Sequence, residues 1–330
     1  MIFSLKSVLK YLILFFVGVG ILYLAFKGQD LNGIWLEIKN AKIHWVMASC
    51  VSLWMAHVLR AARWRMLYQS INYKVGFWHT YHAVIIGYLA NLALPRFGEI
   101  GRCSIMLRTE KVPMFSSIGT VITERLIDVL ILFSGGVFML VFQYNLVSGF
   151  IYNNLYLNFA LKLRSLNYLS LIGIGLVLMF FLFLMIYFIK KKLSKKFLRI
   201  LAGLKQGFNS YGKLKNKALF MLYTFGIWFF YCLSMYLAFS SIQITSNLGF
   251  NAAFTALVFS SFAMVAPVQG GIGVFHWMVA QSLVLYSLSF KDGLAYATII
   301  HSSQILLTLI LGSLSLLAVL TKKQKVTKAV

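Results

Sequence analysis

The sequence has few cysteines, few prolines and few acidic residues. Its three cysteines, Cys50, Cys103 and Cys232, are widely spaced in or near apolar segments, so neither a disulfide framework nor a zinc site is predicted. The chain has seven acidic residues and 31 basic residues, so its formal net charge is +24. In a soluble protein this charge would suggest nucleic acid, so its distribution along the chain decides its meaning.

Recognisable catalytic motifs are also missing. The sequence shows no nucleotide-binding loop, no catalytic triad and no nucleic-acid module, so we expect neither a cofactor nor a catalytic residue. His79 and His82 are three residues apart on a predicted helix, but without a third ligand nearby no metal site is expected.

Long apolar segments are abundant. The chain is 60% hydrophobic with only three prolines, and six segments approach or exceed the roughly 20 residues of a spanning helix. These segments are 8–26, 44–59, 117–143, 168–189, 219–242 and 296–320. The first is long for a signal peptide and no small-residue cleavage site follows, so we interpret it as a retained helix. The sequence predicts an all-α, polytopic bundle with a single domain over 1–330, located in the cell membrane.

The positive charge lies in loops that flank the apolar segments. Residues 190–217 contain ten basic residues and no acid, which predicts a cytoplasmic loop by the positive-inside rule. Apolar residues recur there every three or four positions, as in an amphipathic helix on an anionic leaflet. The rule also places the tail at 321–330 and both termini inside. It also assigns the loop at 60–76 to the cytoplasmic side, because this loop contains the basic residues Arg60, Arg63, Arg65 and Lys74.

The apolar segment 77–94 is predicted not to cross the membrane. Two cytoplasmic loops must be separated by an even number of crossings, yet three apolar candidates lie between 60–76 and 190–217. The segment 77–94 is the exception because it ends at Pro95 and a charged stretch follows. We therefore predict a re-entrant hairpin from the cytoplasm. Irregular backbone at that depth must be buried in protein or line a watery cavity, which implies a site.

A second broken region covers 252–290, where Pro267 and three glycines interrupt two short apolar arms. Two full spans would leave the tail on the same side, but the short arms favour a hairpin from the outside. The predicted architecture is therefore six spans and two re-entrant helical hairpins of opposite orientation. Broken helices in both halves of a chain point to a transporter site near the midplane.

Charged residues within the apolar helix that starts near Ser116 are candidates for that site. A charge facing lipid at mid-depth costs roughly 2.5 to 3.5 kcal/mol, so Glu124, Arg125 and Asp128 should face the bundle. Glu124 and Asp128 share one helix face. Arg125 is free to pair with the neighbouring hairpin or with a lipid phosphate. The alternative is a structural network in which Arg96 or Arg102 pairs with these carboxylates.

The two predicted hairpins carry the remaining candidates. Arg96 and Arg102 suit a lipid phosphate because a guanidinium binds phosphate bidentately. Glu99 would balance charge, accept a proton or contact a cationic headgroup. The alternative is that all three are solvated surface charges. In the second hairpin, Gly270, Gly271 and Gly273 would expose N–H groups at the start of a half-helix, as an anion site or as a break needed for close packing.

Three motifs in order along the chain resemble the flippase-like membrane domain of the lysylphosphatidylglycerol synthases. They are Leu94-Pro95-Arg96-Phe97-Gly98-Glu99 with Arg102, then Glu124-Arg125-Leu126-Ile127-Asp128, then Pro267 with Gly270-Gly271-Ile272-Gly273-Val274-Phe275. The resemblance covers almost the whole chain. His276 stands where that family usually has Glu. About ten residues follow the last predicted span, so we expect no soluble aminoacyltransferase domain.

The resemblance implies lipid translocation. The expected substrate is an anionic or aminoacylated phospholipid or a polyprenyl-phosphate lipid, bound by the candidate residues named above. The alternative is a non-catalytic membrane subunit that presents lipid to a separate aminoacyl- or glycosyltransferase. A purely structural scaffold is the third possibility.

Overall fold

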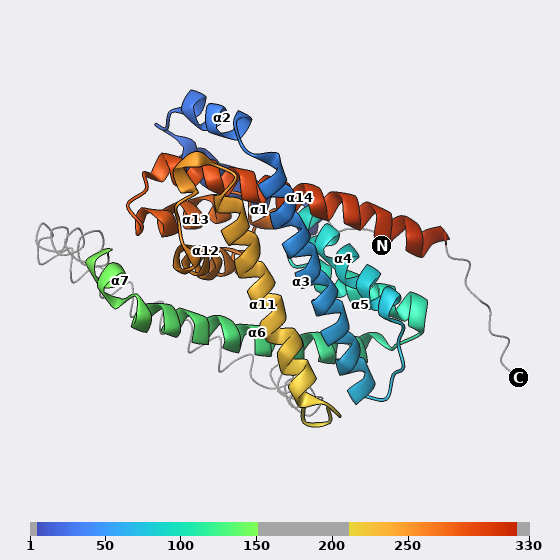
Figure 1. Ribbon diagram of the computed structural model, residues 1–330. Helices are drawn as coiled ribbons and strands as arrows, with labels where there is room; N and C mark the ends of the chain where they lie inside the picture. Colours follow the sequence, from blue (N-terminus) through green and yellow to red (C-terminus); the bar gives the residue numbers. More distant parts are fainter. Residues whose placement is uncertain (1–4, 151–210, 322–330) are drawn as a thin grey trace, which may run out of the picture.

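The computed structural model describes residues 5–150 and 211–321, and every regular element in these two ranges is helical (Figure 1). The elements before the gap are α1 (Leu5–Phe26), α2 (Leu31–Lys39), α3 (Ile43–Ser70), α4 (Phe77–Ala93), α5 (Gly98–Glu110), α6 (Met114–Phe142) and α7 (Tyr144–Phe150). Those after it are α11 (Lys217–Phe239), η2 (Gln243–Thr245), α12 (Phe250–Ala263), η3 (Gln269–Gly271), α13 (Val274–Val284) and α14 (Phe290–Thr321).

Four described helices, α3, α6, α11 and α14, are long and apolar enough to cross a membrane. They cover four predicted spans, and α1 covers a fifth, so the predicted all-helical membrane bundle is confirmed at this level. The sixth predicted span, 168–189, lies outside the described residues. So do most of the basic loop 190–217 and most of the tail 321–330.

One predicted boundary is wrong. Helix α3 continues to Ser70, whereas the sequence placed a cytoplasmic loop from residue 60. Arg60 and Arg63 are therefore buried in a helix instead of lying in a loop. Lys74 does lie in the connection that follows, and Arg65 donates from Nε to the Val75 carbonyl at 3.0 Å.

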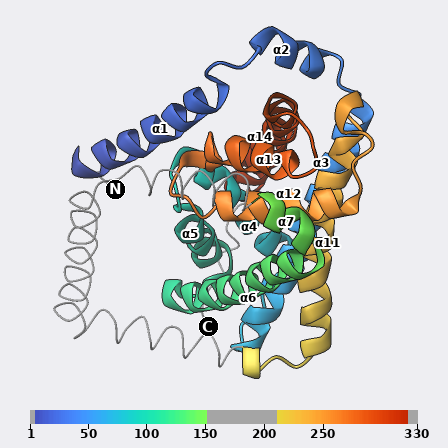
Figure 2. The ribbon, with the colours of Figure 1, turned by 90° about the vertical axis from the view of Figure 1, so that its left-hand side faces the viewer.

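Helices α3 and α11 form the central antiparallel pair, and they lie side by side in both ribbon views (Figures 1 and 2). Small polar residues allow the close approach. The hydroxyls of Ser49 and Ser234 are 2.9 Å apart, and Ser52 donates to the Phe230 carbonyl at 2.8 Å. The C-terminal end of α3 and the start of α11 therefore share one end of the molecule, which we call the basic end.

The first hairpin consists of α4 and α5, and it opens at the basic end. Its base is closed by Glu110, whose Oε1 lies 2.6 Å from the Gly76 nitrogen and 2.6 Å from His79 Nδ1. The two helices pack closely where Gly98 N donates to Asn91 Oδ1 at 2.7 Å. At the tip, Arg96 adopts a left-handed backbone with φ of 61°.

The second hairpin consists of α12 and α13, and it opens at the other end. Helix α6 begins at the basic end, where Tyr68 donates to Ser117 at 3.0 Å, and reaches the base of the second hairpin, where Gln143 donates to the Asn251 carbonyl at 3.4 Å. Tyr286 closes this base by donating to the same carbonyl at 3.0 Å. The two hairpins thus point at each other from opposite sides of the molecule (Figure 1).

The close packing of α13 on α14 gives a stability prediction. A Cβ on Gly293 would lie 2.8 Å from the Ala280 Cα, which is backbone and cannot move cheaply. On α6, a Cβ on Gly119 would meet nothing within 4 Å. We expect Gly293→Ala to lower the midpoint of thermal unfolding in detergent, and Gly119→Ala to leave it unchanged or raise it by helix propensity. Equal midpoints for the two variants would contradict the packing described.

Candidate functional site

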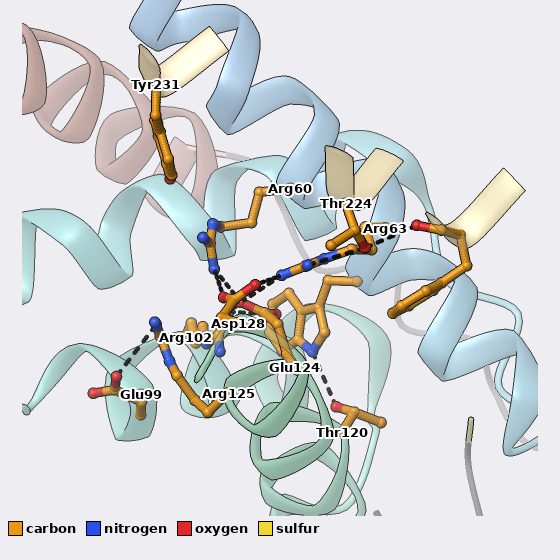
Figure 3. Close-up of polar contacts among 12 residues, drawn as sticks. Arg60, Arg63, Glu99, Arg102, Thr120, Glu124, Arg125, Asp128, Thr224 and Tyr231 are labelled. Carbon is orange, nitrogen blue, oxygen red and sulfur yellow. Dashed lines mark hydrogen bonds and ion pairs between the residues drawn. The ribbon is translucent and has the colours of Figure 1, made fainter. Parts of the chain in front are cut away.

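A cluster of buried charges lies where α3, α5 and α6 meet (Figure 3). Glu124 and Asp128 are one turn apart on α6, and both side chains face the bundle, where their residues are 0% and 8% exposed. Charged groups at this depth need partners because desolvation penalises an isolated ion by several kcal/mol. The structure supplies arginines from two other helices.

Arg60 and Arg63 of α3 hold both carboxylates. Arg60 Nη1 lies 2.6 Å from Glu124 Oε1 and 2.8 Å from Asp128 Oδ2. Arg63 Nη2 lies 2.8 Å from Asp128 Oδ1, and its Nη1 donates to the Thr224 hydroxyl on α11 at 3.2 Å. Three helices are therefore tied together by this one cluster.

Arg102 of α5 brings the first hairpin into the cluster. Its Nη1 lies 3.0 Å from Glu124 Oε2, and its guanidinium carbon lies 4.5 Å from the centre of the Trp64 ring. Trp64 is itself fixed by a 2.9 Å hydrogen bond from Nε1 to Thr120. The Nε and Nη2 atoms of Arg102 are buried and have no hydrogen-bond partner in the described part of the chain.

The cluster contains more positive than negative charge. Three buried arginines share two buried carboxylates, and an arginine does not deprotonate in a protein. One positive charge is therefore left without a carboxylate. A buried charge is stable only with a counter-charge, so the site is suited to a singly charged anion.

A half-exposed pair borders the cluster. Arg125 Nη2 lies 3.3 Å from Glu99 Oε1, with side chains that are 44% and 32% exposed. Both residues line a small cavity together with Arg102, Asn91 and Tyr88. Glu99 Oε2 is buried and unpartnered among the described residues. Two residues with buried polar atoms that lack a partner among the described residues, Arg102 and Glu99, therefore line this cavity.

The chain was compared with known proteins at three levels. The model of the lysylphosphatidylglycerol synthase TM region matches residues 7–312. The chain belongs to this family. Neither a curated protein nor a solved structure matches the chain. Membership in the lysylphosphatidylglycerol synthase TM family makes the chain an integral membrane protein with a role related to membrane lipids.

Five of the residues that sequence analysis selected in this family member lie together. Glu99, Arg102, Glu124, Arg125 and Asp128 form the buried cluster and its border. The alternative of a structural network is confirmed as far as Arg102 pairs with Glu124. The network and a lipid site are compatible, because Arg102 uses one side of its guanidinium for Glu124 and leaves the other unpartnered.

The other selected residues of this family member lie at the hairpin tips. Arg96 Nη2 donates to the Val265 carbonyl at 2.7 Å. Gly271 N donates to the Val268 carbonyl at 3.2 Å, and Gly273 N donates to His276 Nδ1 at 3.4 Å. These two N–H groups are bonded within the protein in this conformation, and the anion site at Gly270, Gly271 and Gly273 stays a prediction.

Sequence analysis missed Arg60 and Arg63. The basic residues that follow the apolar segment 44–59 matched the positive-inside rule, and the rule placed them in a loop. A signal was present, because Arg60 and Arg63 are three apart and share a helix face with the buried Trp64 next to them. Among the described residues, no group of three His, Cys, Asp or Glu side chains could hold a metal ion.

The charge count predicts the cost of removing a carboxylate. Asp128→Asn would leave Arg60 and Arg63 with less counter-charge, and breaking such a buried pair costs about 3 to 5 kcal/mol. We expect a large fall in the thermal unfolding midpoint of the detergent-solubilised protein. Glu99→Gln changes a half-exposed pair, which contributes at most about 1 kcal/mol. If the two variants were destabilised equally, the cluster would not have the structural role described.

Proposed function

We propose that this protein is a lipid translocase that moves an anionic or aminoacylated phospholipid, or a polyprenyl-phosphate lipid, between leaflets. The observation that carries the proposal is the unpartnered side of the Arg102 guanidinium at the cavity. Family membership supports a lipid as the ligand.

The free side of Arg102 matches phosphate chemistry. Nε and Nη2 are parallel N–H donors, and a phosphate accepts such a pair in a bidentate arrangement. Nη1 remains with Glu124, so a bound phosphate need not break the existing ion pair. A phosphodiester carries one negative charge, which equals the positive charge that the cluster leaves uncompensated.

Glu99 and Arg125 extend the site toward the rest of a headgroup. Arg125 adds a second guanidinium to the cavity, and Glu99 Oε2 can accept from an ammonium or hydroxyl group. An aminoacylated phospholipid has a phosphate and an ammonium in one headgroup. The combination of Arg125 and Glu99 in one cavity therefore favours an aminoacylated lipid over a lipid with phosphate alone.

We also propose that both hairpins are re-entrant. Their helices have 17, 13, 14 and 11 residues, each fewer than the roughly 20 of a span. The hairpins open at opposite ends, and together with the six predicted spans they would place the charge cluster at mid-depth. The irregular tips contact each other and also α1 and α14, and irregular backbone at membrane depth needs such protein contacts or a water-filled cavity.

The charges of the described residues support an orientation with the basic end in the cytoplasm. The described residues at this end include one acidic residue, Glu110, and several basic residues. Such an excess of basic residues is typical of the cytoplasmic side. The basic residues are Arg65, Lys74, Arg108, Lys111, Lys213, Lys215 and Lys217. The end of α14 also lies here, because Ser315 contacts His82 at 3.1 Å. The C-terminus would therefore be cytoplasmic, and we propose the same side for the N-terminus, in a multi-pass protein of the cell membrane.

The test is leaflet exchange of labelled phospholipids in liposomes that contain the purified protein. Arg102→Lys keeps the charge beside Glu124 but removes the bidentate N–H pair, so we expect exchange at least about tenfold slower. Arg108→Lys, on the same helix but exposed at the basic end, is the matched control and should exchange at the wild-type rate.

The outcomes separate the two functions. Equal rates for Arg102→Lys and the wild type would refute the proposed site. If the wild type exchanged no lipid, including aminoacylated phosphatidylglycerol, but still bound it through Arg102, the protein would be a subunit that presents lipid to a separate transferase.

A further inference from the structure

The two hairpin tips touch each other near the middle of the molecule. Arg96 Nη2 of the first tip donates to the Val265 carbonyl of the second at 2.7 Å, across 169 residues of sequence. Next to this bond, a Cβ on Gly270 would lie 3.0 Å from Leu92 Cδ2, so the tips are also in van der Waals contact. If a headgroup crosses between the hairpins, as the proposed translocase function implies, this contact must open for it to pass.

The second tip is fastened to its surroundings. His301 of α14 contacts the Gly270 carbonyl through Nε2 at 2.9 Å. A Cβ on Gly273 would lie 2.7 Å from the Leu22 nitrogen, so this tip fits closely against α1. Gly270, Gly271 and Gly273 all have positive φ, which glycine adopts without steric cost. The second tip is therefore a fixed, relaxed surface.

The first tip is held in a different way. Arg96 has φ of 61°, a conformation that is unfavourable for a residue with a Cβ. The bond to Val265 compensates for this strain. Arg96 is exposed, and its guanidinium bonds to a neutral carbonyl, that of Val265. A guanidinium bonds more strongly to an anionic phosphate than to a carbonyl.

We propose that Arg96 is a latch that holds the two tips together until the phosphate of the transported lipid takes its guanidinium from the Val265 carbonyl. The proposal rests on the proposed translocase function. Arg96 lies at the tip from which α5 leads to Arg102, so a phosphate leaving the cavity meets Arg96 on its way to the second hairpin. Release of the bond also lets the backbone at Arg96 relax, which favours the open state.

Two substitutions separate the latch from a structural contact. Arg96→Gln keeps an N–H donor for the Val265 carbonyl but loses the charge, whereas Arg96→Lys keeps both a donor and the charge. A latch opened by phosphate predicts that Arg96→Gln exchanges lipid at least about fivefold more slowly than Arg96→Lys. Exchange by Arg96→Gln at the wild-type rate would overturn the proposal.

Reversible cross-linking tests whether the tips must separate. In a variant with Cys50, Cys103 and Cys232 replaced by alanine and Arg96 kept, Leu92→Cys on the first tip, which meets the second tip at Gly270, and Val265→Cys are joined by bifunctional methanethiosulfonates of graded length. We expect the shortest linker that joins them to slow exchange at least about tenfold, and a reductant to restore it. Each single-cysteine variant, treated with the same reagent, is the control.

The outcomes of cross-linking are also distinct. Unchanged exchange after complete cross-linking, with an active wild type, would overturn the latch and leave the lipid site at Arg102 standing. If the wild type itself exchanged no lipid, the translocase function would fail, and the latch would fail with it.

Discussion

The interaction on which the rest of the structure depends is the ion pairing of Glu124 and Asp128 with arginines inside an apolar bundle. Charges in this environment cannot be left alone. The carboxylates of α6 therefore hold Arg60 and Arg63 of α3 and Arg102 of the first hairpin in fixed positions. Apolar packing alone would leave the hairpin free to slide, because lipid is as apolar as the helix faces. The charge cluster sets the register of α3, α5 and α6.

The same cluster connects structure with lipid chemistry. Its arginines outnumber its carboxylates by one, and two N–H atoms of Arg102 are buried without a partner in the part of the chain described. A fully paired network would only stabilise the bundle. In our proposal the excess charge is compensated by an anion, and the cavity lies in the part of the first hairpin nearer to its tip, which meets the second hairpin. In the proposed translocase, the headgroup site and the path across the membrane would share one element, the first hairpin.

The sequence predicted the helical class and the four helices that are long and apolar enough to cross a membrane, because long apolar segments are local signals. It also predicted the helix breaks near Pro95 and Pro267 for the same reason. It also selected Glu99, Arg102, Glu124, Arg125 and Asp128, because charges within apolar segments stand out. It failed for Arg60 and Arg63, since a basic residue at the end of a span looks the same whether it faces water or a buried carboxylate. It also grouped Arg96 with Arg102. Only tertiary structure shows that one guanidinium reaches Glu124 and the other reaches Val265.

The most direct test of the central claim is the structure of the protein determined in nanodiscs of anionic phospholipid. We expect a lipid phosphate in the cavity, with its oxygens about 2.7 to 3.2 Å from Arg102 Nε and Nη2, while Nη1 stays with Glu124. A lipid phosphate bound elsewhere, with the cavity closed and these two atoms still unpartnered, would contradict the claim.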